Sequence, residues 1–174
     1  MPDRDDEELD PIFLETLLAL PTYEEQSAFL YSRELHNADG LFQLLDEAAY
    51  LVGSDPARAR QLAELCARAA QDTAVQAVIP RATYIRAQTY AINAEYQTAL
   101  ELIASARQGY EALGQRLAAL RTNLGLIHVL QELGRYQEAL EAGKVILENL
   151  RDANDPETAK TAPDRVEIAA KAYQ

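Results

Sequence analysis

The chain repeats part of its sequence at an interval of forty residues. Residues 134–140 read GRYQEAL, and residues 94–100 read AEYQTAL. When the sequence is shifted against itself by this interval, small residues coincide in three copies at Ala59, Ala99 and Ala139. A fixed period of this kind is typical of one structural unit that is stacked several times, with small and apolar residues at the contacts.

Each copy of the repeat contains two helical patterns. In the last copy one apolar face recurs at spacings of three and four residues, at Leu120, Leu124, Ile127 and Leu130. This pattern stops at Gly134, where a left-handed helix end is expected, and a second pattern begins at Tyr136. A connection this short indicates a tight antiparallel hairpin of two helices. Such a hairpin buries one face and needs a neighbour for the other.

We therefore expect an all-α fold, a right-handed stack of three antiparallel helical hairpins over residues 41–151. The first helices are predicted at residues 41–53, 79–93 and 115–132. The second helices are predicted at residues 56–71, 95–112 and 135–151. In the earliest hairpin, Asp55 or Ser54 is predicted to cap the second helix, with Pro56 at its first position.

The segment before the repeats is expected to form an N-terminal helical cap at residues 10–40. Thr22 and Glu25 have the spacing of a capping box at the start of the second cap helix. The stretch HNADG at residues 36–40 is predicted to end that helix. Ahead of the cap, residues 1–9 are acidic and almost without apolar side chains, so a disordered tail is expected there.

The segment after the repeats divides into two parts. Residues 152–163 are polar with two prolines, and we expect a loop. Residues 164–174 rebuild an apolar face, and they are predicted to form the first helix of a truncated further repeat. The chain is therefore expected to be a fragment of a longer one. The exposed face of this terminal helix is a candidate surface for a homodimer.

Composition argues against several classes of function. The net charge is −12 with three Lys residues, which disfavours nucleic acid as a partner. Apolar runs fall short of the eighteen or more residues of a membrane span, and the acidic start does not resemble a secretory signal. A single cysteine, Cys66, fits a reducing compartment. We expect a cytoplasmic protein that contacts neither nucleic acid nor membrane.

The sequence contains no pattern that indicates catalysis. Phosphate-loop, zinc-ligand, GxSxG and HExxH spacings are absent from it. Cys66 coincides with Ala106 and Ile146 under the forty-residue shift, which predicts a buried structural thiol. The expectation is a protein that is not an enzyme, with no cofactor and no metal.

The stretch LQELGRYQEALEAG resembles the tetratricopeptide repeat, whose turn reads Gly-x-Tyr-x-x-Ala. Tyr136 and Ala139 match that turn, while Ala94 replaces its glycine in the middle copy. The period of forty exceeds the usual repeat of about thirty-four residues. In this it is similar to a long-repeat bacterial type, found in the amino-terminal region of proteins with a caspase-like (CHAT) peptidase domain. The resemblance to the repeat covers roughly residues 41–150.

That resemblance implies a concave groove lined by the first helix of each hairpin. The residues that it places in the groove are Arg81, Tyr84 and Gln88 in the middle copy, and Arg121, Leu124 and His128 in the last. Arg81 and Arg121 are equivalent under the forty-residue shift, so two guanidinium groups are expected to clamp a carboxylate of a bound peptide.

The leading functional hypothesis is a non-catalytic interaction or scaffold module. Its groove would receive a protein or peptide partner, including another domain of the same parent chain. Two alternatives remain open at this point. A self-association element predicts an exposed apolar stripe at an end of the stack. A ligand-sensing regulatory domain predicts an enclosed pocket.

Overall fold

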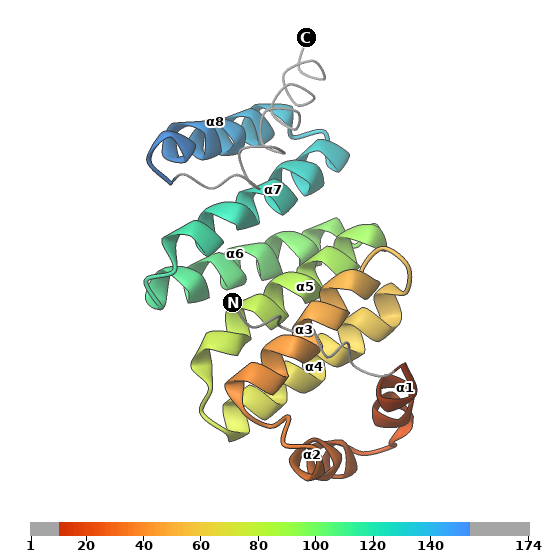
Figure 1. Cartoon of the computed structure of the whole chain (residues 1–174). Helices are drawn as coiled ribbons and strands as arrows, with labels where there is room; N and C mark the ends of the chain where they lie inside the picture. The colour runs from red at the N-terminus through yellow and green to blue at the C-terminus, as the bar shows by residue number, and fades with distance from the viewer. Residues whose placement is uncertain (1–10, 154–174) are drawn as a thin grey trace.

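The computed structural model of the chain describes residues 11–153 (Figure 1). Within this range every regular element is a helix. The α-helices are α1 (Pro11–Ala19), α2 (Tyr23–Ser32), α3 (Ala38–Leu51), α4 (Pro56–Asp72), α5 (Ile79–Ile92), α6 (Tyr96–Ala112), α7 (Arg116–Glu132) and α8 (Tyr136–Ala153), and a short 3₁₀ helix, η1 (Gln76–Val78), precedes α5.

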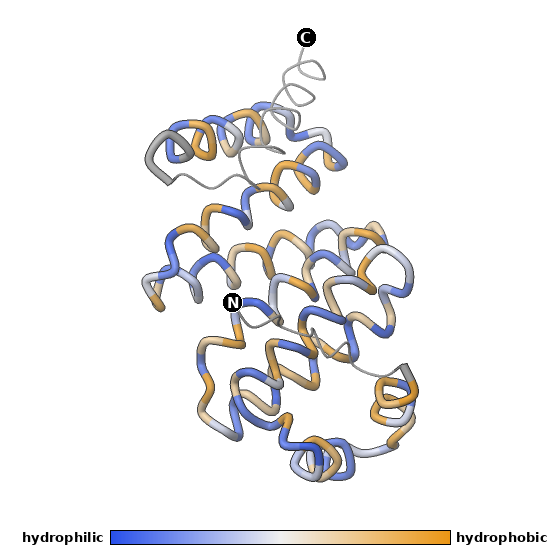
Figure 2. Tube along the Cα trace, in the orientation of Figure 1, coloured by the Kyte–Doolittle hydropathy of each residue, from blue (hydrophilic) through white to orange (hydrophobic). Residues whose placement is uncertain are grey.

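The prediction of an all-α fold is confirmed, and the six repeat helices begin and end within three residues of their predicted bounds. Each of α3 to α7 packs on the helix that follows it in the chain. The helices therefore succeed one another from α1 and α2 at one end to α7 and α8 at the other (Figure 1). Hydrophilic and hydrophobic residues interleave along the helices, as Figure 2 shows.

Several sequence predictions lie outside the described residues. These are the acidic tail at residues 1–9 and the terminal helix at residues 164–174. The loop predicted from residue 152 also falls outside them, apart from its first two residues, which belong to α8.

Local signals at three helix starts explain the boundaries. Thr22 and Glu25 form the predicted capping box of α2. Asp55 accepts a hydrogen bond from the backbone N–H of Arg58 at the start of α4, as predicted. The prediction for HNADG is wrong, because the Asn37 side chain caps α3 by accepting from the Gly40 N–H at 2.9 Å. This stretch begins α3 and does not end α2.

The turns that follow α4, α5, α6 and α7 share one backbone conformation. Ala94, Gly114 and Gly134 have φ of 61°, 69° and 70°, the left-handed region, and they lie twenty residues apart. Ala74, another twenty residues earlier, has φ of 55°. In each turn the next amide donates to a carbonyl five residues back, which is the Schellman helix end. These bonds join Glu95 to Tyr90, Gln115 to Tyr110 and Arg135 to Leu130, at 2.9, 2.9 and 2.8 Å.

Glycine at the turn of the middle copy is expected to stabilise the protein. A left-handed conformation costs an L-residue about 1–2 kcal/mol, so Ala94→Gly should raise the free energy of unfolding by about 1 kcal/mol. The reciprocal change Gly134→Ala should lower it by a similar amount. Urea unfolding followed by circular dichroism measures both. As a matched control, Ala104→Gly on the exposed side of α6 should destabilise by about 1 kcal/mol. A loss of stability in Ala94→Gly would contradict the turn assignment.

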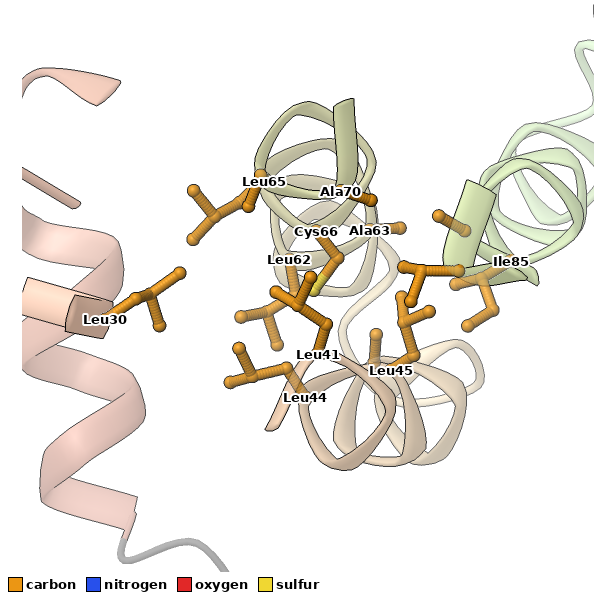
Figure 3. Close-up of a cluster of buried hydrophobic side chains, with 14 of the residues drawn as sticks. Leu30, Leu41, Leu44, Leu45, Leu62, Ala63, Leu65, Cys66, Ala70 and Ile85 are labelled. Atoms are coloured by element: carbon orange, nitrogen blue, oxygen red, sulfur yellow. The ribbon is translucent and has the colours of Figure 1, made fainter. Parts of the chain in front are cut away.

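The largest apolar cluster lies between α2, α3, α4 and α5 (Figure 3). Leu30 reaches it from α2 and Ile85 from α5, while α3 and α4 supply most of its leucines. Cys66 is fully buried in this cluster, so the prediction of a buried structural thiol is confirmed. The small residues that coincide under the forty-residue shift are also completely buried: Ala59, Ala99 and Ala139.

Candidate functional site

Helix α5 contacts α3 and α7 in addition to α4 and α6, so the predicted groove residues on α5 lie close to both neighbouring first helices. On the α3 side, Arg81 forms an ion pair with Asp46. The Arg81 guanidinium also lies 5.8 Å from the centre of the Phe42 ring. The Arg81 side chain is 31% exposed and that of Asp46 is 66% exposed. Arg81 therefore already has an anionic partner, which the sequence reasoning missed.

On the α7 side, Tyr84 lies against the backbone of α7 at Gly125. A Cβ placed on Gly125 would come within 2.8 Å of the Tyr84 hydroxyl and 3.3 Å of its ring. Sequence reasoning found Tyr84 but not Gly125. The glycine itself was a signal of this contact in the sequence. Glycine inside a helix costs about 1 kcal/mol relative to alanine, and it often marks a close approach of another residue.

Tyr110 of α6 is buried in the same part of the molecule. Its side chain is buried, with 8% of its surface exposed, and burial raises the pKa of its phenol to about 12. The positive charges of Arg81 and Arg121 act on that pKa in the opposite direction, and Tyr84 raises it. Screening by salt limits such effects to charges within about 10 Å, so Arg81, Tyr84 and Arg121 lie in the same region of the molecule as Tyr110. We call Arg81, Tyr84, Tyr110 and Arg121 the Arg–Tyr cluster.

Tyr110 itself was not predicted. Under the forty-residue shift it coincides with Ala70 and Leu150, both apolar. A tyrosine where the other copies have aliphatic residues was the available signal, since a buried phenol requires a specific environment.

The remaining predicted groove residues lie in different surroundings. Leu124 is half-buried against the apolar cluster of α7 and α8, so it contributes to the core. Gln88 is half-buried and His128 is exposed. Of the predicted groove residues, Arg81, Tyr84 and Arg121 are the ones that act on the pKa of Tyr110. His128, at the far end of α7, is not among the residues that act on Tyr110.

The described residues offer neither a reactive thiol nor a group of metal-binding side chains. The Cys66 thiol is deeply buried and its pKa is raised to about 12 by that burial, so it is neutral near pH 7 and not a nucleophile. Within residues 11–153, no group of three His, Cys, Asp or Glu side chains has a metal-binding arrangement. The same residues include no helix with the length and apolar character that crossing a membrane requires.

Comparison of the chain with family models, with curated proteins and with solved structures gives no match.

Proposed function

We propose that the chain is a non-catalytic interaction module of the tetratricopeptide type. Its helix pairs form a right-handed α-solenoid in which α3, α5 and α7 line one concave face. That face binds an acidic group of a peptide, or of another domain of the same protein. The observation that supports this most directly is the Arg–Tyr cluster, which combines side chains from α5, α6 and α7.

The hydrogen-bonding capacity of the cluster favours an anionic ligand. Two guanidinium groups supply donors only, in a planar geometry that suits carboxylate oxygens. Tyr110 stays protonated at neutral pH because its pKa is about 12, so no negative charge arises within the cluster. Asp46 holds one of the two arginines in the unbound protein. A ligand carboxylate would therefore compete with Asp46 for Arg81.

Binding measurements on a peptide array test this function. Peptides with free or amidated carboxyl ends are screened, and the tightest binder is measured by calorimetry. Arg81→Ala and Arg121→Ala should each weaken binding about tenfold, because each removes a charged hydrogen bond. Asp46→Asn should strengthen binding, because Arg81 then has no competing carboxylate. Amidation of the peptide should reduce the affinity of the wild type.

The control variant is Arg33→Ala at the end of α2, which removes an exposed cation outside the Arg–Tyr cluster. Its affinity should equal that of the wild type. The opposite signs expected for Arg81→Ala and Asp46→Asn separate a ligand contact from a loss of folding. The proposal fails if both changes alter the affinity in the same direction, or if amidated and free peptides bind equally well.

A further inference from the structure

A cavity of about 530 Å³ opens between α6, α7 and α8, at the end of the molecule where α8 lies (Figure 1). Its walls are mainly apolar side chains from all three helices: Leu100, Leu126, Leu130, Ala142 and Val145. Pockets for small molecules range from about 300 to 1,000 Å³ and are mostly apolar with a few placed polar groups. The cavity shares no residue with the Arg–Tyr cluster.

One polar side chain in this cavity lacks a partner. Asn123 of α7 lines the cavity and is 2% exposed, and its Oδ1 accepts no hydrogen bond. Buried acceptors of this kind are rare in native proteins because leaving them unpaired costs free energy. Oδ1 has no exposed surface as the side chain stands, so contact with a ligand requires the carboxamide to rotate about its last bond, which is a soft torsion. A ligand that donates an N–H or O–H to Oδ1 therefore removes the free-energy cost of the unpaired acceptor.

The charged residues at the rim neutralise one another. Arg135 pairs with Glu138, and their mutual hydrogen bonds raise the pKa of the arginine and lower that of the carboxyl group. The other two pairs near the cavity are Arg107 with Glu111 at 2.9 Å and Lys144 with Glu141 at 2.8 Å. These pairs leave no net charge beside the cavity. A charged ligand would therefore lose its hydration without gaining an oppositely charged partner. The complementary ligand is uncharged.

We propose that this cavity binds a small, uncharged ring compound that carries one N–H or O–H donor. The ring contacts Leu126, Leu130 and Val145, and the donor bonds to Oδ1 of Asn123. The volume lies within the range of small-molecule pockets, and the single buried acceptor suits a ligand with one donor. The site is thus a ligand site, separate from the face proposed above for peptides.

Indole and indene provide a matched pair of probes, because they share size and shape and differ in the N–H group. Titration of the full chain, observed through its methyl NMR signals, should show saturable shifts at Leu126, Leu130 and Val145. Indole should bind about fivefold more tightly than indene, the expected gain for one neutral hydrogen bond. In Asn123→Leu the two affinities should become equal. In the control Asn93→Leu, at the exposed end of α5, the fivefold preference should persist.

Val145→Glu keeps the test decisive if Asn123→Leu does not fold. Val145 is 39% exposed, so the change is tolerable on α8, yet it introduces a carboxylate into an apolar wall. Both probes should then bind more weakly, and to the same extent. The proposal is overturned if the shifts map to other residues, if Asn123→Leu still prefers indole, or if N-acetyl-tryptophan amide binds more tightly than indole. The last outcome would assign the site to a tryptophan side chain of a protein partner.

Discussion

Replacing Gly40 by alanine should lower the free energy of unfolding by about 3 kcal/mol, although alanine is the better helix former. Gly40 lies in the first turn of α3, where a Cβ would come within 2.5 Å of the Leu35 Cα and 2.7 Å of its carbonyl oxygen. These are backbone atoms, so no rotation of a side chain relieves the overlap. The turn before α3 has to move, and the cap bond from the Gly40 N–H to Asn37 is strained with it.

The matched control is Gly53→Ala in the turn after α3. No atom lies within 4 Å of a Cβ placed on Gly53, and its backbone is outside the left-handed region. The substitution should therefore leave stability unchanged or raise it by up to about 1 kcal/mol, because alanine restricts the unfolded chain. Urea unfolding of both variants measures the difference. Equal stabilities of the two variants would show that the backbone at Leu35 does not approach Gly40 as described.

Gly40 illustrates which part of the fold the sequence could not reveal. Asn and Gly occur at both the starts and the ends of helices, so HNADG has two local interpretations. The choice between them depends on the contact of Gly40 with Leu35, which is a property of the folded chain. At Asp55 the following Pro56 permits one interpretation only, and there the sequence prediction was right. The helices themselves were predictable because their apolar periodicity persists over about four turns.

The candidate site was predictable only in part for a related reason. Arg81 and Arg121 were predicted because the resemblance to the tetratricopeptide repeat places both in its groove, and the forty-residue shift makes them equivalent. Asp46 of α3 pairs with Arg81, and Gly125 of α7 lies against Tyr84, so these contacts come from neighbouring helices. Their contacts depend on how each helix is rotated about its axis, and one residue along a helix changes the direction of a side chain by about 100°. A forty-residue alignment does not fix that rotation.

Leucine at Ala99 should lower the free energy of unfolding by about 3 kcal/mol, and leucine at Ala139 by nearer 1 kcal/mol. Both alanines are fully buried, so neither site has room for three additional carbon atoms. The two helices differ in how far they can move to make room for the larger side chain. Ala99 is on α6, which packs on both α5 and α7, so moving away from one neighbour pushes α6 into the other. Among the described helices, α8 packs mainly on α7, so it can tilt to accommodate a larger residue at position 139.

Urea unfolding followed by circular dichroism compares the two variants with Ala104→Leu. Ala104 is exposed on α6 and leucine matches alanine closely in helix propensity, so this control should stay within about 0.5 kcal/mol of the wild type. A stability of Ala99→Leu equal to that of the control would contradict the close contact of α6 with its neighbours. A larger loss at Ala139 than at Ala99 would instead indicate that α8 is held on its outer side by a further contact. In that case residues beyond Ala153 are the first to examine, since they follow α8 directly in the chain.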